Sequence, residues 1–99
     1  SNVFAVIDGQ LVTPALTDTI LPGITRAVVL ELAAREGIDH AEIDSLSVGA
    51  LRNASEIWVT SSIREIFPVT SLDGETVGNG KPGPLWTRMQ SALQAMAHD

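Results

Sequence analysis

The residues best placed to do chemistry lie at the start of an expected helix. The stretch ILPGITRAVVLELAAREG, residues 20–37, predicts a helix with Pro22 at its first position and Gly37 at its stop. Helix starts usually carry Asp or Glu, because an anionic side chain faces the positive end of the helix dipole. The first turn here reads Gly-Ile-Thr-Arg and contains no acid. The sequence therefore raises the question of which negative group completes this turn.

An anion from outside the chain is one answer. First-turn amides have no partner inside a helix, and together with the dipole they form an anion site. Gly23 would let a ligand approach the backbone, and the Thr25 hydroxyl could donate to a phosphate oxygen. The alternative is that Asp18 or Thr19 caps the turn from the preceding loop. The residues alone leave both interpretations open.

A second group of polar atoms follows an expected buried strand. The apolar run EIWV, residues 56–59, leads directly into Thr60, Ser61 and Ser62. Ligands of α/β proteins favour the carboxyl ends of strands, although Thr and Ser are also ordinary turn formers that bond their own backbone. A hydroxyl cluster next to an unfilled helix start would form a phosphate cradle.

Hairpins and helices are the elements that must position these residues. The Asp-Gly pairs at 8–9 and 73–74 predict tight hairpin turns, and Pro68 is typical of an edge strand. An amphipathic helix is expected to begin near Pro84. Hairpins mixed with helices predict one domain over residues 1–99, of the α+β or mixed α/β class.

Composition argues against several kinds of partner. The net charge of −6, from twelve acidic and six basic residues, predicts no affinity for nucleic acid. The absence of cysteine excludes disulfides and thiolate metal sites. Neither His40 nor His98 has a second ligand at useful spacing, so no metal is expected. No apolar run approaches the roughly 20 residues of a membrane span, and no leader is evident. A cytoplasmic protein is the expectation.

The chain is rich in apolar residues and poor in catalytic groups. Its 99 residues are 44% hydrophobic, which is more than a small interior hides, so part of the apolar surface is expected to meet another domain or subunit. The only lysine, Lys81, lies in a Gly/Pro-rich loop that does not suit Schiff-base chemistry. These residues alone therefore make a poor basis for an independent enzyme.

Four motifs occur in an order that resembles a known family. They are SNVF, DGQLVTPALTDTILPGITR, EIWVTSSIREIFPV and LDGETVGNGKPGP. The chain resembles, from Ser1 through its last helix, the carboxyl-terminal part of the fold-type-IV, pyridoxal-phosphate-dependent aminotransferases. This class IV family contains D-amino acid aminotransferases, branched-chain aminotransferases and aminodeoxychorismate lyases. The resemblance implies that the missing anion is the phosphate of pyridoxal 5'-phosphate.

The resemblance also assigns roles to residues. Family members hold the phosphate with the backbone after the LPG turn and the threonine of GITR, which implies Ile24 and Thr25 here. The hydroxyl cluster implies further phosphate or substrate-carboxylate contacts from Ser61 and Ser62, and a backbone contact to substrate from Ile63. Within the family, TSSIREI looks most like the D-amino acid aminotransferases, whose usual form is near TSSTREI. Branched-chain aminotransferases tend toward Gly-Thr-Ala-Ala at this point.

The start of the chain also matches the family. Ser1 and Asn2 correspond to the end of a serine-rich motif near the cofactor. The Schiff-base lysine, a phosphate-binding arginine and a glutamate that pairs with the pyridine nitrogen are expected before this point. The resemblance thus implies a carboxyl-terminal cofactor-cradling domain over residues 1–99, with the amino-terminal part absent and no catalytic residue of its own.

The complete protein is expected to be a homodimeric aminotransferase. It would move an amino group from an amino acid, with a D-amino acid such as D-alanine as the expected donor, to a 2-oxo acid. The alternatives are a branched-chain aminotransferase or a lyase of the same fold, or a non-catalytic anion-binding or interaction module.

Overall fold

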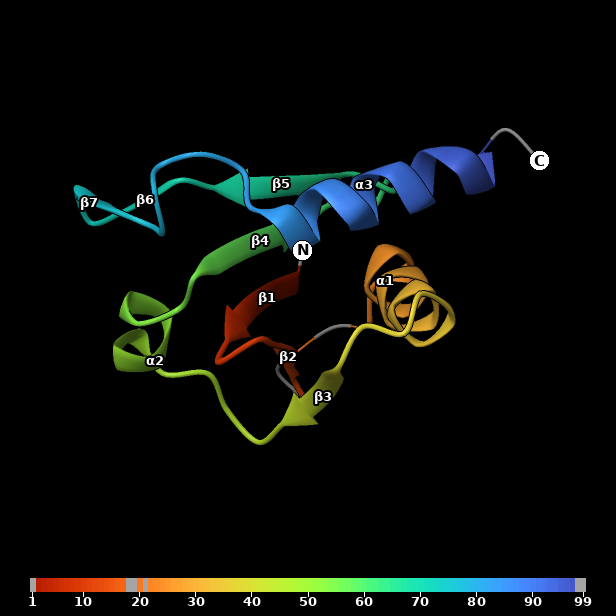
Figure 1. Cartoon of the computed structure of the whole chain (residues 1–99). Coiled ribbons are helices and arrows are strands. Elements are labelled where there is room, and N and C mark those ends of the chain that lie inside the picture. Colours follow the sequence, from red (N-terminus) through yellow and green to blue (C-terminus); the bar gives the residue numbers. More distant parts are fainter. Residues whose placement is uncertain (1, 18–19, 21, 98–99) are drawn as a thin grey trace.

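A five-stranded mixed sheet carries the other elements of the chain (Figure 1). The computed structural model describes residues 2–17, 20 and 22–97. The sheet has the order β3-β2-β1-β4-β5, with bounds β1 Asn2–Ile7, β2 Gln10–Pro14, β3 His40–Ile43, β4 Glu56–Thr60 and β5 Ile66–Val69. A small hairpin and three helices complete the described elements: β6 Ser71–Leu72, β7 Glu75–Thr76, α1 Ile24–Arg35, α2 Val48–Arg52 and α3 Pro84–Ala97.

Both expected Asp-Gly turns are confirmed. Asp8 and Gly9 join β1 to β2 with φ of 51° and 80°, and Asp73 and Gly74 join β6 to β7 with φ of 52° and 80°. Two successive residues with positive φ match the right-handed twist of the flanking strands, and Asp and Gly tolerate this conformation. The edge position of β5 likewise confirms the interpretation of Pro68.

The directions of the strands determine where loops gather. β1 pairs antiparallel with β2 and with β4, while β2 pairs parallel with β3. The carboxyl ends of β2, β3 and β4 therefore lie along one edge of the sheet. This edge runs across the strands, and β1 begins there. A parallel pair needs a crossover connection, and α1 provides it between β2 and β3. The helix returns along the sheet, so its amino end lies at that same edge.

The principal core lies on the face of the sheet that α1 and α3 cover. It is formed by side chains from both helices and four strands, among them Phe4, Leu11, Val29, Leu32, Trp58, Ile66, Met89 and Leu93. Phe4 and Trp58 are fully buried, with ring centroids 6.1 Å apart. Trp58 is thus one of the largest side chains of this core. This mixture of a mixed sheet and helices confirms the α+β, mixed α/β class.

The opposite face of the sheet has a smaller core. Ala5, Val12 and Ile57 are buried there together with Ala54 and Val77. Figure 1 shows α2 and the β6–β7 hairpin on the side of the molecule away from α1. Within the described ranges, no helix combines the length and the apolar composition needed to cross a bilayer.

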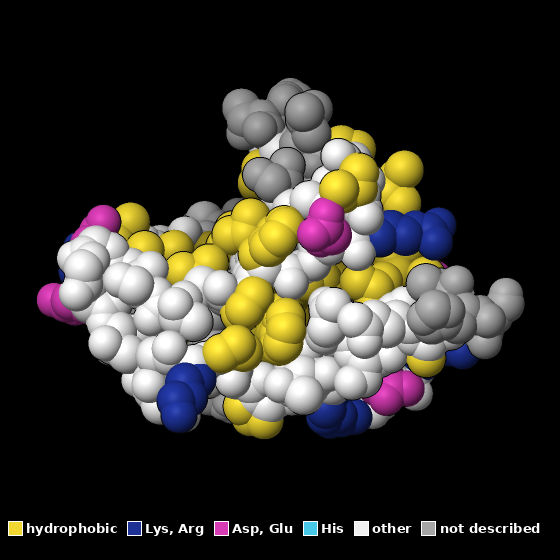
Figure 2. Space-filling model, turned by 90° about the horizontal axis from the view of Figure 1, so that it is seen from above, with side chains coloured by type: hydrophobic (Ala, Val, Ile, Leu, Met, Phe, Trp, Pro, Cys, Tyr) yellow, Lys and Arg dark blue, Asp and Glu magenta, His cyan; other side chains and the backbone are white. Residues whose placement is uncertain are grey.

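Several large apolar side chains reach the surface. Phe67, Ile63 and Ile24 are 48%, 72% and 66% exposed. The strand register places Val3, Val59 and Phe67 side by side across β1, β4 and β5. Figure 2 shows hydrophobic side chains gathered over the middle of the view from above, with Lys and Arg toward its edges. Part of the surface that the structure describes is therefore apolar, as the composition predicts.

Candidate functional site

The start of α1 is open to a ligand. Gly23 is the N-cap residue, with extended φ and ψ of −97° and 144°, and it brings no side chain to the first turn. The first turn carries no acidic residue. α1 begins at Ile24, so the expectation that Pro22 occupies the first helical position is wrong; Pro22 precedes the cap because Gly23 is extended. Asp18 and Thr19, the alternative caps, lie outside the described residues.

The start of α3, in contrast, is capped by a carboxylate of the chain itself. Glu56, at the first position of β4, is 6% exposed. Its Oε2 accepts from the Leu85 amide at 3.1 Å, and its Oε1 accepts from the Trp86 amide at 2.8 Å. Oε1 also accepts from the Trp58 indole N–H at 3.1 Å. Residues near Pro84 give no signal for this cap, because Glu56 comes from another strand 29 residues before Leu85.

The first turn of α1 lies against the start of β1. A Cβ at Gly23 would lie 2.4 Å from Oδ1 of Asn2, so only glycine fits without displacement. The Asn2 amide donates to the Thr60 hydroxyl, and that hydroxyl donates to the Asn2 carbonyl, both at 3.3 Å. The beginnings of α1 and β1 and the end of β4 therefore meet at one point. Ser1, which the sequence places beside the cofactor, lies outside the described residues.

Thr25 joins the two groups of polar atoms that the sequence singles out. Its side chain is 1% exposed, and its Oγ1 accepts from the Arg64 amide at 3.0 Å. A hydroxyl has one proton to donate and two lone pairs. Because Oγ1 accepts here, its own proton can still be donated to a second acceptor. The helix start and the turn after β4 are thus in direct contact, as the cradle hypothesis requires.

The turn after β4 is held by its own backbone and presents its tip to solvent. The Ser61 amide donates to the Glu65 carbonyl at 2.9 Å, and the Ile63 amide donates to the Ser61 hydroxyl at 3.3 Å. Arg64 has a φ of 59°, the left-handed region that non-glycine residues seldom adopt. Ser62 and Ile63 are exposed at the tip. The Ser61 hydroxyl and the Ile63 amide therefore bond each other, while Ser62 faces outward.

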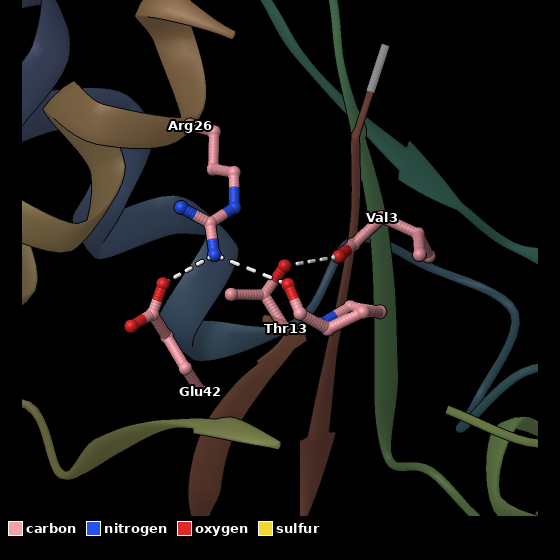
Figure 3. A network of polar contacts seen from close by, with 5 residues as sticks. Val3, Thr13, Arg26 and Glu42 are labelled. Carbon is pink, nitrogen blue, oxygen red and sulfur yellow. Dashed lines mark hydrogen bonds and ion pairs between the residues drawn. The ribbon is translucent and has the colours of Figure 1, made fainter. Parts of the chain in front are cut away.

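A buried arginine ties the first turn of α1 to the sheet. Arg26 is 5% exposed, and its Nη2 donates to the Pro14 carbonyl at 3.1 Å and pairs with the Glu42 carboxylate (Figure 3). Beside it, the Thr13 hydroxyl donates to the Val3 carbonyl at 2.7 Å. Nε of Arg26 is buried with no hydrogen-bond partner among the residues described. The sequence indicates this cation but not its partners, which come from β2 and β3.

The donor groups suit a phosphate. The amides at the start of α1, the Thr25 hydroxyl and the outward Ser62 hydroxyl are all hydrogen-bond donors, and the first turn holds no competing acid. Helix starts of this kind bind phosphate through amides and dipole together. The residues present therefore fit the phosphate of pyridoxal 5'-phosphate, the group that the sequence resemblance implies.

Fold and site together define a mixed-sheet domain with an uncapped helix start whose donors suit an anion. Comparison with known proteins then identifies the family: residues 1–72 match the family described as amino-transferase class IV, and the chain belongs to this family. The resemblance seen in the four sequence motifs is thus confirmed.

Characterised relatives include enzymes of two specificities. The chain is 43% identical over 94 residues to the D-alanine aminotransferase of Bacillus licheniformis. The alignment covers 95% of this chain and 33% of that protein. The chain is 44% identical over 92 residues to the branched-chain-amino-acid aminotransferase of Escherichia coli K12, covering 93% and 29%. The chain thus spans about a third of the length of these relatives.

Solved structures show the same fold. The Escherichia coli branched-chain amino acid aminotransferase superimposes with a TM-score of 0.89 at 42% identity, over 95% of this chain and 31% of that one. An aminotransferase from Brucella abortus, bound to the cofactor PLP, superimposes with a TM-score of 0.90 at 30% identity, over 100% and 34%. The described elements therefore form part of the fold-type-IV architecture.

Proposed function

We propose that this chain is the carboxyl-terminal, cofactor-cradling part of a pyridoxal-phosphate-dependent aminotransferase. One observation carries the proposal. The hydrogen bond from the Arg64 amide to the Thr25 hydroxyl brings the open helix start and the hydroxyl turn together at the edge where three strands end. Ligands of sheets with parallel strands bind at such an edge. Membership of the class IV family supports the same conclusion.

Each residue of the site has a proposed part. Amides of Ile24 and Thr25, with the Thr25 hydroxyl, hold the phosphate, and Ser62 adds a hydroxyl from the turn. Ser61 shapes that turn through its bond with the Ile63 amide. Ser62 then faces the substrate carboxylate, and Ile63, whose amide is engaged, contacts the substrate through its exposed side chain. When bound, the cofactor supplies a conjugated ring that accepts electron density from the substrate's amino-bearing carbon. No catalytic residue is assigned to the chain itself; the Schiff-base lysine belongs to the remainder of the protein.

The proposed reaction moves an amino group from an amino acid to a 2-oxo acid. A D-amino acid such as D-alanine is the proposed donor, because TSSIREI, residues 60–66, resembles the D-amino acid branch. A branched-chain L-amino acid is the second candidate, since identity to the Escherichia coli enzyme is as high as to the Bacillus licheniformis one. Assay of the complete protein with D-alanine and with L-leucine, each with 2-oxoglutarate, separates the two. Turnover of L-leucine alone would overturn the D-amino acid assignment.

The proposed assembly is a cytoplasmic homodimer of a longer polypeptide. Exposed apolar side chains such as Ile63 and Phe67 support further protein contacts beyond the described residues. The remaining two thirds of the polypeptide, inferred from the length of the relatives, would contribute the rest of the site.

Replacing Thr25 by valine in the complete protein tests the site. Valine has nearly the shape of threonine but neither donates to a phosphate nor accepts from the Arg64 amide. Loss of one hydrogen bond to a charged group, about 1.5 to 3 kcal/mol, should weaken cofactor binding roughly tenfold or more. Thr25→Ser keeps the hydroxyl and is the matched control. Cofactor retained after dialysis is read by absorbance, alongside a thermal melt of the apo form. Unchanged retention in Thr25→Val would remove Thr25 from the cradle.

A further inference from the structure

Arg26 occupies a place where a cation opposes helix stability. It lies in the first turn of α1, at the positive end of the dipole, and it is 5% exposed. The Glu42 side chain that pairs with it is 50% exposed, so only one member of the ion pair is buried. Such pairs are weak evidence for stabilisation, because desolvation of the buried charge offsets the attraction. Stability of α1 alone therefore gives no reason for an arginine here.

The contacts of Arg26 give a different reason. One nitrogen, Nη2, reaches the Pro14 carbonyl at the end of β2 and the Glu42 carboxylate on β3. Figure 3 shows the Arg26 guanidinium directed toward Glu42, below the helix that carries it. β2 and β3 are the strands that α1 connects. The Arg26 side chain thus connects the first turn of α1 to both β2 and β3, at the point where these strands end.

The contacts of Arg26 lie next to the donors of the proposed phosphate site. Thr25, whose hydroxyl bonds the Arg64 amide, directly precedes Arg26 in the same helical turn. The connection between Pro14 and Gly23 contains no helix and no named strand among its described residues. The Arg26 side chain therefore links the two ends of this connection directly, from the first turn of α1 back to Pro14.

We propose that Arg26 is the positioning residue of the phosphate-binding turn. It holds the Ile24 and Thr25 amides and the Thr25 hydroxyl at the orientation that a phosphate requires, without contacting the ligand itself. The inference rests on the proposed function. A residue that only supported the fold would affect binding of the whole cofactor. A positioning role for Arg26 instead predicts that its loss weakens only the contacts to the phosphate.

Two ligands that differ only in the phosphate provide the test. The complete protein, stripped of cofactor, is titrated with pyridoxal 5'-phosphate and with pyridoxal. Arg26→Gln should raise the dissociation constant for pyridoxal 5'-phosphate by about tenfold, because the displaced turn loses one charge-assisted contact to the phosphate. The dissociation constant for pyridoxal should stay within about twofold. Arg88→Gln is the matched control, since Arg88 also donates to a backbone carbonyl, that of Glu36, but from an exposed position on α3. It should change neither constant.

A second variant separates positioning from simple attraction between charges. Glu42→Gln keeps the Arg26 cation but removes its ionic partner at a half-exposed position where folding should persist. If Arg26 positions the turn, the dissociation constant for pyridoxal 5'-phosphate rises about threefold. If only its charge matters, binding tightens, because an uncompensated cation remains beside the site. Tighter binding would overturn the inference, and Glu42→Gln carries the test should Arg26→Gln fail to fold.

The Thr25→Val protein distinguishes failure of the inference from failure of the proposed function. Selective loss of pyridoxal 5'-phosphate binding in Thr25→Val but not in Arg26→Gln would overturn the role of Arg26 and leave the cradle standing. Equal weakening of both ligands by Arg26→Gln would also overturn it. No effect in either variant would refute the phosphate site itself.

Discussion

Replacing Glu56 by alanine should destabilise the protein by about 2.5 to 5 kcal/mol. The carboxylate accepts from the Leu85 and Trp86 amides and from the Trp58 indole, and it is almost wholly buried. Loss of the helix cap accounts for about 1 to 2 kcal/mol. The fully buried indole N–H loses its charged acceptor, which adds about 1.5 to 3 kcal/mol. The sum gives the expected range.

Glutamine at position 56 is the matched variant. Its carbonyl oxygen can still accept from Trp86 and Trp58, but its NH₂ group faces the Leu85 amide as a second donor. We expect half of that loss, roughly 1.3 to 2.5 kcal/mol. Urea unfolding of the complete protein gives the free energies, and amide hydrogen exchange at Leu85 and Trp86 locates the change at the start of α3. A Glu56→Ala protein within about 1 kcal/mol of the parent would refute the argument.

Two backbone predictions concern the edge of the sheet that holds the site. Gly23→Ala should cost about 1 to 3 kcal/mol, because its Cβ would lie 2.4 Å from the Asn2 side chain; an unchanged thermal melt would show that Asn2 moves aside freely. Arg64→Gly should stay within about 1 kcal/mol of the parent, whereas Arg64→Val should lose about 1 to 2 kcal/mol more, because a β-branched residue resists the φ of 59° at this position. Identical melts of the two Arg64 variants would contradict the second prediction.

Local patterns were sufficient to predict most of the elements. The Asp-Gly pairs identify both hairpin turns, since few other residues accept two successive positive φ angles. Pro22 and Gly37 bracket α1 within two residues of its bounds, and apolar spacing predicts α3 from its first residue, Pro84. Turn formers and periodicity act over a few residues, which is the scale on which these elements form.

Contacts between distant residues could not be predicted in this way. Thr25 and Arg64 are 39 residues apart, and Arg26 and Glu42 are 16 apart. Neither pairing leaves a periodic trace, because each depends on how β2, β3 and β4 come to share an edge. The sequence thus predicts Thr25 and the turn after β4 as members of one phosphate cradle, but it does not predict the contact between them. Their phosphate-binding role stays a prediction until cofactor binding is measured.

The turn after β4 combines buried positions that packing constrains with exposed positions that can vary. Its anchors, Thr25 and Thr60, are each 1% exposed and bonded to neighbouring backbone, so substitution there disturbs the packed interior. Ser62 and Ile63, at its tip, are exposed, and exposed positions usually tolerate replacement within about 0.5 kcal/mol. New side chains can therefore be tried at the tip with little risk to folding. Under the proposed function, single substitutions at Ser62 or Ile63 would change the substrate contact in a protein that stays folded.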